Sequence, residues 1–282
     1  MLSCLSTAWS RRCAAVLTCL LLAPLLGSET ASAAPFLQVD AAVSVNDSGL
    51  SLQAKPGWRA SLWDQEGSVL LNNTHLTPTA WLQVTPDFAR AGGEISFSPV
   101  AVFELRGHVL ATRYFGNINT LIGFEDREAQ YGPSDREGLT RDSGSTLRFG
   151  ATPILKAQVG SVVAVAAGET QVVRLRSDVL SEPYWFDPES QLMLSRDETV
   201  FLGTGLLAWS GTARSWDLIT GLLTTGRAAA NSGDKLLRTG PMIKAQKSES
   251  HFSYLLLVQP YLSDRAFGPS QPYIAAQASY AL

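Results

Sequence analysis

The chain has 282 residues, of which 45% are hydrophobic and 17% charged, and its formal net charge is −3. This composition excludes intrinsic disorder, which requires low hydrophobicity and high net charge. It also argues against a nucleic-acid partner, because basic charge normally supplies that affinity. A mean hydropathy of +0.07 with so few charges is unusual for a soluble protein, yet too polar for a bundle of membrane helices.

The amino-terminal segment has the three regions of a secretory signal peptide. Arg11 and Arg12 precede an apolar run over residues 13–27, and Ala31-Ser32-Ala33 is a small-residue cleavage site. The apolar run is shorter than the ~20 residues that a membrane helix needs. We therefore expect a signal peptide over residues 1–33 and export of the remainder.

Cleavage of the signal peptide would remove every cysteine of the chain, namely Cys4, Cys13 and Cys19. The mature domain, residues 34–282, is therefore predicted to contain no disulfide, no reactive thiol and no cysteine-ligated metal. Its own core or hydrogen-bond lattice must hold it together.

Apolar and polar residues alternate along this domain with the period of a β-strand. From Leu50 to Leu62, for example, every even position is apolar. The alternating segments exceed the usual ~5–6 residues of globular strands and match the ~9–11 residues of a strand that crosses a bilayer. The pattern predicts an all-β fold, an antiparallel transmembrane β-barrel of about twelve strands over residues 36–46, 50–63, 68–85, 89–98, 100–114, 145–157, 161–175, 198–210, 213–225, 235–247, 251–262 and 271–282.

The connections between these strands fit such a barrel, which has tight turns on the periplasmic side and longer loops outside. An even number of strands also places both ends of the domain on the periplasmic side. The predicted periplasmic turns are 64–67, 98–99, 158–160, 211–212 and 247–250, and the predicted outer connections are 46–49, 86–88, 115–144, 176–197, 226–234 and 263–270.

The segment from Arg90 to Phe115 has an alternating strand, a Ser-Pro turn, a second alternating strand and terminal aromatics. In this segment and in its overall pattern the chain resembles the porin-like bacterial outer-membrane β-barrel proteins. Members of that family commonly end in Phe, whereas this chain ends in Leu282. The resemblance implies residence in the outer membrane, contact with its lipids and insertion by the barrel-assembly machinery.

A secreted soluble β-sandwich is the alternative fold, because its strands also alternate, although they are usually shorter. Aromatic girdles at the membrane interfaces would favour the barrel. The candidates for these girdles are Tyr114, Phe115, Tyr184, Trp185, Trp209, Tyr254 and Tyr273.

If the apolar faces contact lipid, the polar faces line a lumen. Basic residues outnumber acidic ones on these faces, which would favour anions in a water-filled pore. In a narrow barrel the same charges would instead pair and fill the interior. The candidate lumen-lining residues are Lys55, Arg59, Glu94, Glu104, Arg106, Arg148, Lys156, Asp217, Arg238 and Lys244, with Asp40 beside them.

Catalytic and cofactor signals are weak. The three histidines are far apart in sequence, so neither a metal site nor a cofactor is predicted. His251 and Ser253 would share one face of a strand, as base and nucleophile do in some outer-membrane lipid hydrolases, with Asp264 as the nearest acid. Those enzymes act at the outer leaflet, whereas this pair is predicted at the periplasmic end. Lumen-facing polar residues are the favoured interpretation, and the protein is not predicted to be an enzyme.

Two functions of different classes follow from the sequence. The first is porin-like passage of small hydrophilic solutes, anions among them. The second is a non-conducting barrel that serves as the outer-membrane component of an envelope-spanning secretion or surface-motility assembly, with periplasmic or outer-membrane protein partners. A lipid-modifying enzyme centred on His251 and Ser253 is the third and weakest hypothesis.

Overall fold

A computed structural model describes residues 33–46, 49–63, 70–71, 74–116, 121–178, 180–267 and 271–282. The predicted signal peptide, except for Ala33, and the predicted turn at residues 64–67 lie outside the described residues. The first strand begins at Ala33, the last residue of that predicted signal. Within the described ranges, the chain has no helix long and apolar enough to span a membrane.

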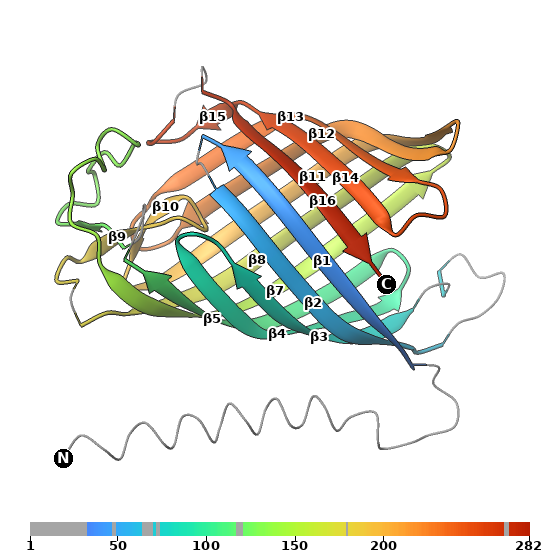
Figure 1. Ribbon diagram of the computed structural model, residues 1–282, viewed down its shortest axis with the longest axis horizontal. Helices are drawn as coiled ribbons and strands as arrows, with labels where there is room; N and C mark the ends of the chain where they lie inside the picture. Colours follow the sequence, from blue (N-terminus) through green and yellow to red (C-terminus); the bar gives the residue numbers. More distant parts are fainter. Residues whose placement is uncertain are drawn as a thin grey trace, which may run out of the picture.

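The fold is a closed antiparallel barrel (Figure 1). The ring closes because β1 pairs with both β2 and β16, and β12 pairs with both β11 and β13. Its strands are β1 (Ala33–Val45), β2 (Gly49–Ser61), β3 (His75–Val84), β4 (Phe88–Val100), β5 (Phe103–Phe115), β7 (Ser143–Val159), β8 (Val162–Arg176), β11 (Asp197–Ala213), β12 (Trp216–Ala229), β13 (Lys235–Lys247), β14 (Phe252–Gln259), β15 (Tyr261–Ser263) and β16 (Tyr273–Ala281).

The number of strands agrees with the sequence prediction. The sheet has 13 strands, but β14 and β15 are two pieces of one crossing, separated at Pro260. Proline has no backbone N–H to donate, so it interrupts the hydrogen-bond ladder at that point. The barrel therefore has twelve crossings, and the predicted all-β antiparallel architecture is confirmed.

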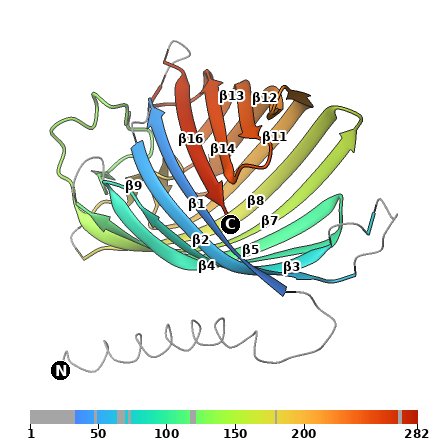
Figure 2. The ribbon, with the colours of Figure 1, turned by 45° about the vertical axis from the view of Figure 1, so that its right-hand side comes forward.

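A second, three-stranded sheet was not predicted. It consists of β6 (Gly123–Phe124), β9 (Tyr184–Asp187) and β10 (Leu192–Ser195), in the order β10-β9-β6. These short strands belong to the two segments that the sequence analysis treats as plain outer loops, 115–144 and 176–197. In Figures 1 and 2 this sheet lies at one end of the barrel, between its walls.

Several predicted turns lie elsewhere. The turn between β4 and β5 is Ala101-Val102 rather than Ser98-Pro99, and the register shifts between Phe97 and Val100. The Ser98 hydroxyl bonds to the carbonyl oxygens of Val100 and Phe103, so the Ser-Pro pair forms an irregularity inside the strand. The turn between β11 and β12 is likewise at residues 214–215 rather than 211–212, and β3 begins at His75 rather than at 68.

The outer surface of the barrel is apolar. Leu207 and Leu222, near the middle of β11 and β12, are 60% and 57% exposed. A closed barrel satisfies every backbone group within the wall, which lets such a surface face lipid. The fold and this surface identify an outer-membrane barrel.

The predicted aromatic girdles are correct only in part. Phe115, Trp209 and Tyr254 are exposed on the outer surface. Tyr114 and Trp185, by contrast, are completely buried inside the barrel, because Tyr114 is in the inward phase of β5 and Trp185 is in the second sheet. Tyr184 also belongs to the second sheet, and Tyr273 is in the inward phase of β16.

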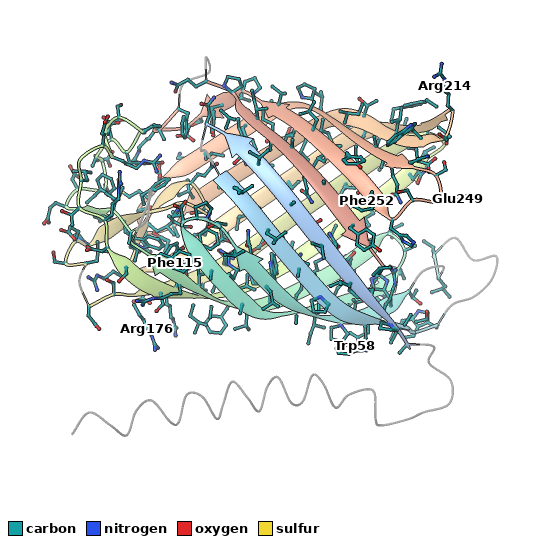
Figure 3. The ribbon with its side chains drawn as sticks, viewed as in Figure 1. Trp58, Phe115, Arg176, Arg214, Glu249 and Phe252 are labelled. Carbon is teal, nitrogen blue, oxygen red and sulfur yellow. The ribbon has the colours of Figure 1, made fainter. Side chains whose placement is uncertain are left out.

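The two ends of the barrel differ. Tight turns, which carry Arg214 and Glu249, lie at one end, and the long connections lie at the other, beside Phe115 and Arg176 (Figure 3). By the convention of bacterial barrels the short-turn end is periplasmic and the long-loop end extracellular. Both described ends of the chain, Ala33 and Leu282, belong to the short-turn end.

The apolar exterior gives a stability test. Leu222→Arg places a charge on the lipid face at mid-strand, so we expect the free energy of unfolding to fall by about 2–4 kcal/mol. Ser143→Arg, on the same face at a strand end, should lower it by no more than ~1 kcal/mol. Urea titration of barrels folded in lipid vesicles measures both, and equal costs would contradict the proposed depth of Leu222.

Candidate functional site

Two outer connections fold into the extracellular mouth of the barrel, and we call residues 121–142 and 180–196 the plug. Plug side chains Trp185, Leu192 and Leu194 are fully buried. They belong to one hydrophobic cluster with inward-facing residues of the wall, among them Tyr114 and Leu236. The alternation that points one face of each strand to lipid thus points the other face at the plug, and wall and plug share a hydrophobic cluster at the mouth.

The rim of the barrel holds the plug through Asp234, in the connection between β12 and β13. Its carboxylate accepts hydrogen bonds from the Tyr131 hydroxyl at 2.5 Å and from the backbone N–H of Met193 at 2.7 Å. The Ser232 hydroxyl donates to the carbonyl of Met193 at 2.6 Å. Burial and the neighbouring Asp234 carboxylate raise the pKa of Tyr131, so it remains a donor.

The tip of the plug is the turn between β9 and β10. Asp187 begins the turn and accepts bonds from the backbone N–H and the hydroxyl of Ser190, at 2.9 and 2.6 Å. Gln191 has a φ of +56° and donates its N–H to the carbonyl of Asp187 at 2.8 Å. These local bonds fix the direction in which Asp187 and Glu189 present their carboxylates.

Arg148 of β7 forms ion pairs with the carboxylates of both Asp187 and Glu189. Its guanidinium lies 2.8 Å from Asp187 Oδ1 and 2.9 Å from Glu189 Oε2, and the side chains of Arg148 and Asp187 are both fully buried. The same guanidinium donates to Gln171 at 2.9 Å and to the Tyr114 hydroxyl at 3.2 Å. A buried charge pair is tolerated when further hydrogen bonds satisfy its polar atoms. These two bonds engage Nη1 and Nη2, whereas Nε faces Glu189 as an ion pair without a hydrogen bond.

Three more arginines surround the tip, from different strands. Arg90 of β4 forms an ion pair with Glu189. Arg238 of β13 donates to the Gln191 side chain at 3.0 Å, and Arg227 of β12 donates to the carbonyl of Glu189 at 2.8 Å. In the order of strands around the ring, β4 and β13 lie on opposite sides. The tip therefore reaches across the whole lumen.

A cavity of about 230 Å³ lies directly below the tip, on the periplasmic side. Glu189 and Ser190 of the tip form part of its lining, as do Arg148 and Arg227. Four of the predicted lumen residues meet here, since Lys55, Glu94, Arg106 and Arg148 all line it.

Barrel strands β2, β3, β4, β5 and β7 form a wall of charged side chains on the periplasmic side of the plug, which we call the charged wall. Glu104 accepts bonds from Ser96 at 2.7 Å and from Arg106 at 2.5 Å, and it forms an ion pair with Lys156. His108 lies 3.7 Å from Glu169 of the adjoining strand β8. The predicted residues Glu104, Arg106 and Lys156 thus form one connected cluster.

Barrel strands β8, β11, β12, β13 and β14 form an apolar wall on the opposite side of the lumen. In strand register, Leu206 lies opposite Val165 and Leu223, and Met242 lies opposite Leu257. None of these side chains belongs to the buried clusters of the plug. The apolar wall consists of Val163, Val165, Leu206, Ala208, Leu223, Met242, Leu255 and Leu257.

The remaining predicted lumen residues lie apart from the cavity. Asp40 is buried on β1 and accepts bonds from Gln38 and Gln277, and Arg238 belongs to the arginines around the tip. Arg59 lies beside His75, with 3.0 Å between their nitrogens. Asp217 accepts a bond from Thr212 at 3.0 Å. Asp217 and Lys244 are in the inward phase of their strands and are exposed, near the short-turn end.

The structure does not bring the predicted hydrolase residues together. His251 and Ser253 lie at the short-turn end of β14, whereas Asp264 follows β15 at the opposite end. Asp264 instead accepts bonds from the backbone N–H groups of Ala266 and Phe267, and burial raises its pKa to about 6. Nor does any group of three metal-ligating side chains gather within the described part of the chain.

Sequence reasoning missed several residues of the site. Arg90 has the same inward phase as Glu94 and could have been included on that ground. Arg227 fell in a predicted loop, because β12 continues four residues beyond the predicted end at 225. Asp187 and Glu189 lie between two apolar runs, Tyr184-Trp185-Phe186 and Leu192-Met193-Leu194, and this spacing is a hairpin signal.

The sequence matches no protein-family model and no curated protein significantly. Among solved structures, the β domain of the Bordetella autotransporter BrkA is 11% identical, with a TM-score of 0.47 over 88% of this chain and 99% of that one. The translocator domain of the autotransporter NalP from Neisseria meningitidis is 10% identical, with a TM-score of 0.40 over 98% and 96%.

A loop-deleted OmpT, an outer membrane protein of Vibrio cholerae, is 8% identical, with a TM-score of 0.38 over 90% of this chain and 100% of that one. Similarities this distant say nothing about function.

The buried pair gives a test of the plug. Arg148→Met leaves Asp187 buried without its cation, and such a loss typically costs about 3–5 kcal/mol. We expect the free energy of unfolding, measured by urea titration in vesicles, to fall by that amount. Arg174→Met is the control, because Arg174 lies 3.8 Å from Asp197 and both side chains are exposed. Its effect should stay below ~1 kcal/mol, and an equally large effect would argue against the importance of burial.

Proposed function

We propose that this protein is a non-conducting outer-membrane barrel whose lumen is a vestibule that receives its ligand or partner from the periplasm. The observation that carries the proposal is the plug tip, which contacts Arg90 on one side of the ring and Arg238 on the other. A turn held at both walls crosses the lumen and obstructs the passage of solutes at that level.

Porin-like passage of hydrophilic solutes would require the plug to leave. That movement would expose Trp185, Leu192 and Leu194, whose burial contributes about 1.5–3 kcal/mol each. It would also separate the buried pair of Arg148 and Asp187. Because these costs add, the geometry favours a closed barrel over the open conduit of our first hypothesis.

Access from the periplasm is supported by the inward residues near the short-turn end. Gln158, Thr212, Asp217 and Lys244 have the inward phase of their strands and are exposed to solvent. A barrel closed outside and accessible from the periplasm is compatible with the role of outer-membrane component in an envelope-spanning assembly. The proposal therefore develops our second hypothesis.

Planar bilayer recordings test the closed state. We expect the purified wild-type protein to give no steady conductance. Asp187→Asn combined with Glu189→Gln removes the charges that anchor the tip and should raise the open probability at least about 10-fold, since each lost buried ion pair weakens the closed state by more than 1.4 kcal/mol. Asp197→Asn, an exposed acid just after β10, should leave the recordings unchanged.

Steady wild-type conductance, in protein whose folding is verified by heat-modifiable gel mobility, would overturn the proposal. So would a double variant as silent as the wild type, because the tip would then not be the closing element.

A further inference from the structure

The apolar wall is unexpected in a vestibule filled with water. Its residues form two rows across neighbouring strands. One row runs through Val165, Leu206 and Leu223, and the next passes from Ala208 through Gly221 to Met242 and Leu257. Leu206 and Leu223 are partly exposed. Apolar surface in water is unfavourable in proportion to its area, so an occupant that covers this wall is stabilised.

Arg227 lies at the upper end of the wall. It occupies the same inward phase of β12 as Leu223, four residues nearer the plug, which corresponds to about 13 Å along the strand. Its guanidinium donates one hydrogen bond, to the carbonyl of Glu189. In the described ranges no carboxylate forms an ion pair with it, whereas Arg90 has one such partner and Arg148 has two. Arg227 therefore presents an uncompensated charge to the cavity.

Lys55 is the second cation of this kind. Its ammonium lies 3.8 Å from the centre of the Trp81 ring, and no described carboxylate forms an ion pair with it. The cavity is lined by four cationic side chains, Lys55, Arg106, Arg148 and Arg227, and by three anionic ones, Glu94, Glu169 and Glu189. Arg148 and Arg106 also form ion pairs with Asp187 and Glu104, outside this lining, so Lys55 and Arg227 are the lining cations for which a ligand carboxylate would supply a partner.

We propose that the vestibule binds a single-chain amphiphile with a carboxylate head, such as a fatty acid. The carboxylate lies at Arg227 and Lys55, and the hydrocarbon chain follows the apolar wall toward the periplasm. A guanidinium fork matches a carboxylate in shape and charge. The chain covers Leu206 and Leu223, which are partly exposed and face the lumen below Arg227. This assignment rests on the proposed function, since it requires a lumen closed above and accessible from the periplasm.

A series of soluble carboxylates tests the two halves of the site separately. Butyrate and decanoate are added to protein in lipid nanodiscs, binding is measured by calorimetry, and empty nanodiscs supply the background for partition into lipid. Each methylene moved from water to an apolar surface strengthens binding about fourfold at full burial. We expect decanoate to bind at least about 100-fold more tightly than butyrate, and decanol, which lacks the charge, at least about 10-fold more weakly than decanoate.

Variants assign the roles to residues. Arg227→Gln should weaken both carboxylates about 10-fold, because it removes the charge at the head. Leu223→Asn should weaken decanoate about 10-fold and leave butyrate unchanged. Arg214→Gln, in the exposed turn between β11 and β12, is the matched control and should bind like the wild type. Heat-modifiable mobility verifies folding of every variant.

Equal affinities for butyrate and decanoate would overturn the proposal in favour of a plain anion site. Equal affinities for decanol and decanoate would overturn the assignment of the head group. If decanoate does not bind while bilayer recordings remain silent, this inference fails and the proposed closed vestibule stands. If the wild type conducts, the proposed function itself fails.

Discussion

One buried guanidinium, that of Arg148, connects the wall of the barrel to the plug. Arg148 is on the wall, and the two carboxylates that it binds are on the plug, so the pair joins two parts of the chain that are distant in sequence. In the low dielectric of a protein interior neither partner is stable alone. The buried charge of Arg148 therefore needs the plug in its observed position. The carboxylates of the tip in turn need the arginines of the assembled barrel wall.

The geometry of the tip follows from this requirement. Hydrogen bonds from Ser190 and Gln191 to Asp187 fix the conformation of the turn, so that its carboxylates point at the wall. Arginines from four strands then surround the tip, but only Arg90 and Arg148 are matched by charge. The others bond to a carbonyl or an amide, which leaves positive charge beside the cavity. The arginines that hold the tip thus also supply the positive charge beside the cavity.

The sequence predicted the barrel well because alternation is a local signal with a strict period of two. It placed Lys55, Glu94, Glu104 and Arg148 on the correct phase of their strands, since phase needs only one reliable position per strand. It did not reveal the plug, because β9 and β10 are four residues each and pair only with one another and with β6. The strands that the tip contacts are brought together only when the ring closes, so no local sequence pattern predicts these contacts.

The charged wall and the apolar wall also explain why apolar and polar residues alternate more clearly in some strands than in others. Between β2 and β7 most inward positions are polar, so these strands alternate more clearly, although Leu110 and Ile154 are inward and apolar. On β8 and β12 the inward residues Val163, Val165 and Leu223 are apolar as well, and the period weakens because both faces are apolar. A strand with lipid outside and water inside has no reason to lose its period in this way. The hydrocarbon chain of the proposed amphiphile would account for this loss on β8 and β12.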